Sequence, residues 1–313
     1  MVFQTKRKLI QLASSSLVVS MPKQWVKEYH LEKGDSVNVS IIGSSVVVSP
    51  EEASFDIKKS VEISALSKHM IEMIILSAYR AGYSELTLTY SKPFCKDLKS
   101  GGRSVEIPKL IRNVVSNLIG FEVVKQTAFS SIIKEVASSD SSEFESLFRR
   151  TFLLVLDYTT TVKDVLFSKS LSQDTELLTL KRLLNYCVRL LRKKGRSDYE
   201  FSLSLFPYLY ALSDLVETYS FILLFSSKCR KLNNSLSLVF DYSNSLVRLS
   251  YEFYYSPSKD KLKEYYSLRR RAYTFINNLR GGSKLSRCGL TVLDYLALAV
   301  AQTGKLIDLK LSM

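Results

Sequence analysis

The side chains that most often catalyse reactions or bind metals are few in this sequence and lie far apart. There is no Cys-x-x-Cys pair, and the six thiols and imidazoles are Cys95, Cys187, Cys229, Cys288, His30 and His69. A zinc site needs clustered thiolates or imidazoles. The spacing therefore argues against a zinc site, and we expect the cysteines to be small buried apolar residues of a protein in a reducing compartment.

A pair of glycines raises the question of a phosphate-binding loop. Gly101 and Gly102 lie in a polar stretch, but the Lys-Ser/Thr pattern that completes such a loop does not follow them. An enzyme would otherwise need a nucleophile with its base, paired acids or a cofactor loop. None of these is discernible in the sequence, so we expect a protein that is not an enzyme and has no cofactor.

Basic residues are the groups that do cluster. Residues 143–313 carry 26 Lys or Arg against 16 Asp or Glu, which is most of the formal net charge of +14. Two stretches are especially basic: Arg189, Arg192, Lys193, Lys194 and Arg196 form one, and Arg269, Arg270, Arg271, Arg280, Lys284 and Arg287 the other. They could contact phosphate groups, DNA or an acidic protein face. Alternatively, they reflect the preference of Lys and Arg for helix C-termini.

The overall composition is that of a globular protein with long helices. The 313 residues suit two or three domains, and they are 46% hydrophobic and 24% charged with only 6 prolines and 11 glycines. The first twenty residues lack the apolar core of a signal peptide, and no uninterrupted apolar run reaches eighteen residues. We therefore expect a cytoplasmic protein without membrane insertion.

The first fifty residues predict a small β-rich domain. Alternating stretches predict short strands at residues 5–12, 16–21, 36–42 and 45–49. Pro22 suits the first turn of a short helix over residues 23–30, and Gly34 can take a positive φ in the turn that follows. A piece of this size has too little core to be stable alone. We expect it to interlock with a second copy.

These residues resemble a known family. Residues 16–27 (SLVVSMPKQWVK), 31–37 (LEKGDSV) and 46–48 look like the AbrB/SpoVT-type swapped-hairpin domain. In that family two chains interleave their hairpins into one barrel-like dimer, which binds double-stranded DNA through basic residues near the dimer surface. Carried across by position, the resemblance implies that the phosphate contacts are made by Lys6, Arg7, Lys8, Lys23 and Lys27.

One departure from that family bears on DNA binding. The arginines common in its bacterial members are mostly absent, and residues 1–50 hold six basic against three acidic side chains. Basic side chains that neutralise phosphates need not read bases. The alternative is a module that dimerises the chain without touching DNA.

Residues 53–138 predict a small α/β connector domain. Helical spacing covers residues 70–82 and 108–120, and strand-like stretches follow at 85–90, 121–126 and 130–137. The polar stretch around Gly101 is expected to be a loop.

The remainder of the chain predicts six helices. They are expected at residues 143–170, 173–195, 199–228, 233–255, 258–280 and 286–312. The connections are short, with turns at Gly195 and at Gly281–Gly282 among others, so neighbouring helices should pack as a bundle. An offset of 87 residues aligns Tyr186 with Tyr273 and Gly195 with Gly282, among four such pairs. This repetition favours two three-helix bundles, at about 139–230 and 231–313.

This layout resembles the PhoU family, whose members contain two such bundles and regulate phosphate uptake. Chains that join an AbrB-like start to PhoU-like helices are a known prokaryotic arrangement, chiefly archaeal. PhoU helices typically carry acidic pairs that bind metal, but here the pairs are incomplete, since Tyr210 replaces the partner of one aspartate. A metal is therefore not expected; the only ligands worth naming are Asp157, Asp164, Asp214 and Glu217.

Together these patterns predict an α+β, mostly α chain with domains at residues 1–52, 53–138 and 139–313. We expect a homodimeric DNA-binding transcription regulator of the AbrB–PhoU type, linked to phosphate uptake or homeostasis, with a transport or signalling protein as a further partner. The alternative is a PhoU-like adaptor acting on a transporter or kinase, in which the first domain only dimerises.

Overall fold

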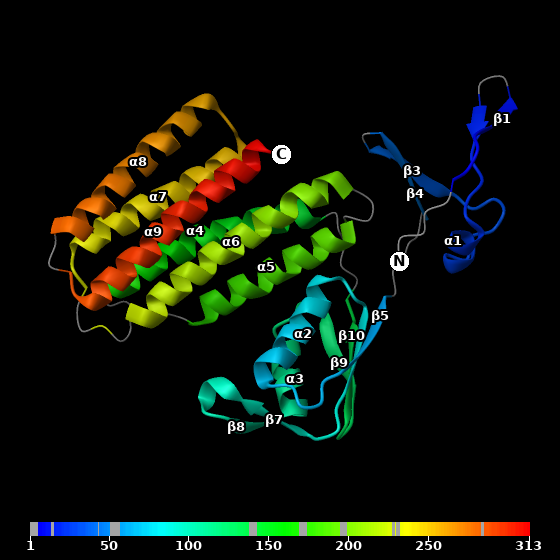
Figure 1. Ribbon diagram of the computed structural model, residues 1–313, viewed down its shortest axis with the longest axis horizontal. Helices are drawn as coiled ribbons and strands as arrows, with labels where there is room; N and C mark the ends of the chain where they lie inside the picture. The colour runs from blue at the N-terminus through cyan, green and yellow to red at the C-terminus, as the bar shows by residue number, and fades with distance from the viewer. Residues whose placement is uncertain are drawn as a thin grey trace. The chain divides into compact units, whose positions relative to one another are not determined.

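The computed structural model describes most of the chain, which forms two compact units, Met1–Phe55 and Asp56–Met313 (Figure 1). The residues it describes are 6–13, 16–42, 44–50, 57–137, 143–168, 174–194, 199–226, 229, 232–282 and 285–313.

The N-terminal unit contains two antiparallel hairpins with one short helix between them. Its elements are β1 (Ile10–Ala13), β2 (Ser16–Val18), α1 (Lys23–Glu28), β3 (Val37–Ile42) and β4 (Ser45–Pro50). The predicted order is confirmed, but the first strand begins at Ile10 and not at residue 5. Gly34 does take a positive φ, of 105°.

This unit exposes the residues that would normally form a core. Val39 pairs with Val48 and Ile41 with Val46 in the β3–β4 register, so all four side chains lie on one face of the hairpin. Ile41 is 81% exposed and Val46 65%. Among the side chains that the structure describes in this unit, Pro50 is the one buried apolar residue. Burying such a face requires surface from outside a single unit.

The second unit begins with a four-stranded sheet of order β5-β6-β10-β9. Its strands are β5 (Lys58–Glu62), β6 (Glu85–Thr89), β9 (Phe121–Gln126) and β10 (Ser130–Glu135). Strands β5 and β6 are parallel and are joined by α2 (Lys68–Arg80), whereas the other pairs are antiparallel. The polar sequence KKSVE of β5 gives no alternation, which is why this strand was not predicted.

Two helices cover one face of this sheet. Helix α2 and α3 (Ile107–Val115) bury their apolar sides against alternate strand residues such as Leu86 and Leu88. Between β6 and α3 the chain forms a further hairpin, β7 (Phe94–Asp97) and β8 (Arg103–Glu106), joined by the 3-10 turn η1 (Leu98–Ser100). The expected loop is thus only the tip of a β-hairpin.

The remaining described residues form six helices, as predicted. They are α4 (Phe144–Ser168), α5 (Asp174–Lys194), α6 (Tyr199–Ser226), α7 (Ser235–Tyr255), α8 (Lys259–Gly282) and α9 (Arg287–Leu311). The bounds agree with the predicted ones to within a few residues. Gly281 and Gly282, expected as a turn, instead form the last residues of α8.

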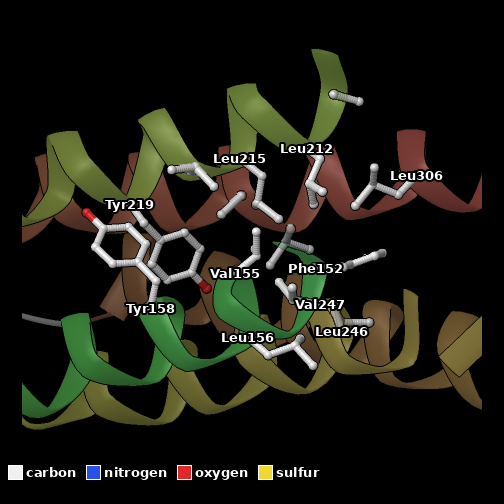
Figure 2. Packing of buried hydrophobic residues seen from close by; sticks show 14 of the residues in the cluster. Phe152, Val155, Leu156, Tyr158, Leu212, Leu215, Tyr219, Leu246, Val247 and Leu306 are labelled. Atoms are coloured by element: carbon white, nitrogen blue, oxygen red, sulfur yellow. The ribbon is translucent and has the colours of Figure 1, made fainter. Parts of the chain in front are cut away.

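Side chains from all six helices form one continuous hydrophobic core (Figure 2). Phe152 and Val155 of α4 lie beside Leu212 and Leu215 of α6, with residues of α7 and α9 around them. The division into two three-helix bundles remains a prediction, because the core runs through both halves.

Helices α6 and α9 are unusually apolar for helices at a surface. Residues 202–226 and 287–311 are long and apolar enough to span a membrane, and half of the most apolar window of each is buried in the bundle. Core helices of a bundle pass the same test. The absence of membrane insertion remains a prediction.

Candidate nucleic-acid interface

The five predicted DNA-contacting residues are all exposed in the N-terminal unit. Lys6, Arg7 and Lys8 lie in the non-helical stretch that precedes β1. Lys23 and Lys27 stand one helical turn apart on α1, so they share one side of that helix. Val26 and Trp25 are half-buried on the other side, where the Trp25 ring lies 5.6 Å from that of Tyr29.

This arrangement suits phosphate contacts more than base recognition. Exposed ammonium groups on flexible stems can each approach a phosphate, which releases condensed counterions. The structure thus brings Lys23 and Lys27 together on one side of α1. Lys6, Arg7 and Lys8, which are neighbours in the sequence, are exposed.

The predicted basic stretches of the bundle are largely occupied by internal contacts. The Lys193 ammonium lies 2.6 Å from the Glu135 carboxylate, and Arg280 lies 2.6 Å from Asp294. The Arg192 guanidinium lies 5.5 Å from the centre of the Phe206 ring.

Other members of the two stretches are exposed or lie outside the described residues. Arg270 and Arg271 on α8 and Arg287 at the start of α9 are exposed. Arg196, Lys284 and the side chain of Lys194 lie outside the described residues. The interpretation of the two stretches as a repeated basic corner stays a prediction.

Arg189, which appears in sequence to belong to the first stretch, is buried between the sheet layer and the bundle. Its guanidinium donates to the carbonyl oxygens of Tyr79 and Tyr83 at 2.8 and 3.0 Å, and to Glu135 at 2.9 Å. It also lies 4.5 Å from the centre of the Phe121 ring. Arg189 is therefore a structural residue that joins α5 to the connector.

The four acidic residues considered as metal ligands do not form a cluster. Asp157, Asp164, Asp214 and Glu217 are all exposed, and Glu217 pairs with Lys181 at 2.9 Å. Within the described part of the chain, no group of three His, Cys, Asp or Glu side chains could hold a metal ion.

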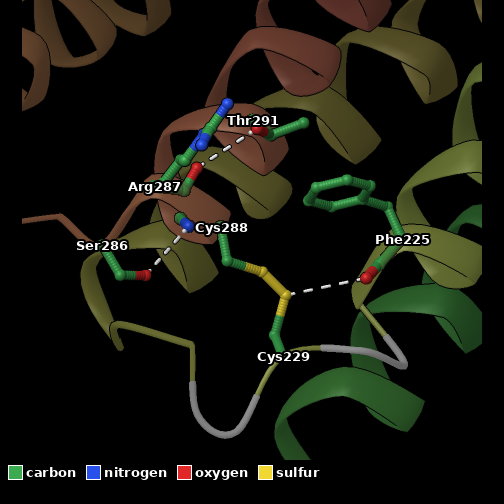
Figure 3. Close-up of a disulfide and its surroundings, with 7 residues drawn as sticks. Phe225, Cys229, Ser286, Arg287, Cys288 and Thr291 are labelled. Carbon is green, nitrogen blue, oxygen red and sulfur yellow. Dashed lines mark hydrogen bonds between the residues drawn. A yellow bond between two sulfur atoms is a disulfide. The ribbon is translucent and has the colours of Figure 1, made fainter.

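The cysteines divide into two kinds, which corrects the expectation that all four are simply buried. Cys229 and Cys288 form a disulfide with their Cα atoms 6.2 Å apart, tying the α6–α7 connection to the start of α9 (Figure 3). Cys95 and Cys187 are free and buried, and burial raises the pKa of the Cys187 thiol to about 12.

One comparison with known proteins gives a match, and it concerns the N-terminal unit. Residues 10–56 match the family described as "Antidote-toxin recognition MazE, bacterial antitoxin". No curated protein and no solved structure matches the chain. The N-terminal unit is therefore a MazE/AbrB-like domain, in agreement with the predicted resemblance, and a sheet layer and helices follow it in the chain.

Proposed function

We propose that the protein is a DNA-binding transcription regulator. Its N-terminal unit would hold double-stranded DNA as a homodimer, while the helices sense a signal or dock a partner protein. The observation that carries this proposal is the match of residues 10–56 to a MazE/AbrB-like domain, a fold of the DNA-binding, transcription-regulator type. The exposed Lys6, Arg7, Lys8, Lys23 and Lys27 supply the positive charge that such a role requires.

The finer parts of the proposal come from the sequence. The link to phosphate uptake or homeostasis depends on the order of the helices alone, and we propose it on that basis. We also propose a cytoplasmic location, because the first twenty residues lack the apolar core of a signal peptide, and no catalytic activity, because the sequence shows no nucleophile with its base, paired acids or cofactor loop. In the alternative function, the chain is an adaptor for a transporter or kinase, and the N-terminal unit serves only to dimerise it.

Salt dependence of DNA binding tests the proposal. In the full-length protein, replacing Lys6, Arg7 and Lys8 by alanine removes six charges per dimer. Since each lost phosphate contact changes the slope of log K against log salt by about 0.9, the slope should fall by up to about five. Fluorescence anisotropy on a mixed-sequence duplex at several salt concentrations measures it.

The matched control replaces three exposed basic residues of α8, Lys259, Lys263 and Arg270. This triple variant should keep the wild-type slope to within about one unit. If the wild type and both variants have equal salt slopes, the N-terminal unit does not contact DNA through Lys6, Arg7 and Lys8, and the adaptor function is favoured.

Dimerisation has its own test. Val39 is 62% exposed and Ile41 81%, and both lie on the apolar face of the β3–β4 hairpin. Placing a charge at a buried dimer contact is costly. Analytical ultracentrifugation should therefore show the wild type as a dimer, and Ile41→Asp as a monomer with unchanged helix content. A dimeric Ile41→Asp protein would contradict the hairpin as the dimer contact.

A further inference from the structure

The β7–β8 hairpin of the connector carries an unusual concentration of basic charge. Residues 51–142 contain twelve Lys or Arg, and six of them fall within residues 92–112, against two of the eleven acidic residues. Four of the six belong to the hairpin and the residues just before it, and the other two, Lys109 and Arg112, lie on the adjoining helix α3. The net charge is +2 over residues 92–106, +4 over residues 92–112 and −3 in the rest of residues 51–142. Charge concentrated in one segment forms a local positive field, whereas interspersed charges of both signs do not.

The basic side chains of the hairpin are exposed. Lys92, Lys96, Lys99 and Arg103 all face solvent. None of the four takes part in a salt bridge between described residues. In this they differ from Lys193 and Arg280 of the bundle, whose charges are paired internally.

The hairpin also has an apolar component on its outer side. Phe94 is 59% exposed and Leu98 70%, although neighbouring Cys95 is buried against the connector core. By strand alternation, Phe94 and Lys96 point away from that core, and Glu106, which pairs with Phe94 in the register, is the one acidic strand residue on this side. Arg103 pairs with Asp97 and so starts from the other face, but it lies next to the tip and its side chain is exposed.

The tip of the hairpin is held in a fixed shape by Asp97. This carboxylate accepts from the Lys68 ammonium at 2.9 Å, from the Lys99 backbone N–H at 3.1 Å and from the Ser100 hydroxyl at 3.2 Å. The Lys68 contact lowers the pKa of Asp97, so the carboxylate stays charged at neutral pH. The hairpin is therefore pre-formed, and binding would not need to order it.

Two glycines leave the tip open. Gly101 and Gly102 have φ of 73° and 82°, which L side chains rarely adopt, and no atom lies within 4 Å of where a Cβ would be. A ligand can therefore approach the backbone of the tip closely. Figure 1 shows the hairpin at the edge of the layer formed by α2 and α3.

From these observations we infer that the β7–β8 hairpin is a second duplex-DNA contact surface, separate from the N-terminal unit. A two-stranded β-ribbon fits the major groove of B-DNA. Lys92, Lys96, Lys99 and Arg103 contact phosphates, and Phe94 and Leu98 make apolar contact with the groove. The inference extends the proposed function, because it gives the same ligand a contact outside the MazE/AbrB-like domain.

The test compares three triple variants of the full-length protein on the same mixed-sequence duplex. Lys96→Ala/Lys99→Ala/Arg103→Ala should lower the salt slope by up to about 2.7 per chain, at about 0.9 for each contact. The α8 triple variant at Lys259, Lys263 and Arg270 removes the same charge and should change the slope by less than about one. Equal slopes for the hairpin and α8 variants would overturn the inference.

The N-terminal triple variant separates this inference from the proposed function. If the salt slope falls in the N-terminal triple variant but not in the hairpin triple variant, the inference is refuted and the proposed function stands. If the salt slope falls only in the hairpin triple variant, the inference is supported and the N-terminal unit is not the DNA site. Competition with single-stranded RNA tests the kind of nucleic acid. If RNA competes better than duplex DNA for the wild type, and this preference is lost in the hairpin triple variant, duplex DNA is not the partner of the hairpin.

A second variant tests the apolar contacts without changing the charge. Phe94→Ala/Leu98→Ala should weaken duplex binding several-fold by the same factor at every salt concentration, because no phosphate contact is lost. Both side chains are mostly exposed, so circular dichroism should show an unchanged fold. Unaltered affinity would exclude apolar contact and contradict a ribbon seated in the groove.

Discussion

Replacing the buried Arg189 by methionine should destabilise the second unit more than any other single basic substitution in the bundle. The Arg189 side chain is 1% exposed, and its guanidinium makes three hydrogen bonds that cross from α5 to the connector. Methionine keeps much of the apolar stem but not the guanidinium, whose central carbon lies 5.0 Å from the centre of the Tyr79 ring and 4.5 Å from that of Phe121. The variant therefore removes mainly the charge and its hydrogen bonds.

The size of the effect follows from what is left behind. The Tyr83 carbonyl oxygen loses the Arg189 donor, and the Tyr79 carbonyl oxygen keeps the Gly82 N–H at 3.1 Å. The Glu135 carboxylate, whose side chain is 13% exposed, loses Arg189 and keeps Lys193. Removing one partner of a buried ion pair lowers the free energy of unfolding by about 3–5 kcal/mol. Since Lys193 still compensates part of the charge, we expect a loss of about 3 kcal/mol in the free energy of unfolding.

Lys193→Met is the matched control. Its ammonium contacts the same carboxylate, but the Lys193 side chain is 26% exposed and Arg189 remains to pair with Glu135. The expected loss is about 1 kcal/mol. Urea unfolding of the full-length proteins, followed by circular dichroism, gives both values. If Arg189→Met costs no more than Lys193→Met, the reasoning from burial is wrong.

Three further predictions concern single sites in the helical half. Reduction of the Cys229–Cys288 disulfide, or Cys229→Ser, should lower the free energy of unfolding by about 4 kcal/mol for a loop of 59 residues; equal urea midpoints with and without reductant would contradict this. Cys187 keeps its proton until about pH 12 when folded but loses it near pH 9 when unfolded. The contribution of Cys187 to the free energy of unfolding is therefore complete below pH 9 and declines above it. The stability advantage of the wild type over Cys187→Ala should shrink by up to about 1.4 kcal/mol per pH unit. A constant difference in stability between the two proteins from about pH 8 to 10 would count against a buried thiol. Gly304→Ala places a Cβ 2.9 Å from the Arg269 guanidinium, which must shift, but alanine also favours the interior of α9 by about 1 kcal/mol over glycine. The free energy of unfolding should therefore change by less than about 1 kcal/mol in the wild-type background and rise by about 1 kcal/mol in the Arg269→Ala background; thermal melts with equal effects in both backgrounds would contradict the contact.

The helices and the N-terminal hairpins could be predicted because their information is local. An apolar period of 3.6 residues locates α4 to α9, and alternation with turn residues locates β3 and β4. Segments with weak local patterns were missed. In β7 the apolar Phe94 points outward and the polar Asp97 is buried, so the usual rule for finding a strand fails there.

The role of Arg189 could not be predicted because its partners are distant in sequence. Tyr79, Tyr83 and Glu135 lie 110, 106 and 54 residues away. A window over residues 189–196 shows only a dense run of basic residues, and such a run usually faces solvent. The exposed charge of the β7–β8 hairpin was missed for the opposite reason, because four basic residues spread over residues 92–103 do not form a dense run.

The contacts of α5 also limit how this chain can be recombined. Tyr186 packs against both the bundle core and the connector core, and Arg189 and Asn185 bond to residues of the connector. A gene fusion that transplants the helices without residues 57–137 would remove all of the hydrogen-bond partners of Arg189 and expose the side of α5 that packs against the connector. The module that can be exchanged between proteins is therefore the whole second unit, and the connection near residues 55–56 is where the chain can be cut and rejoined.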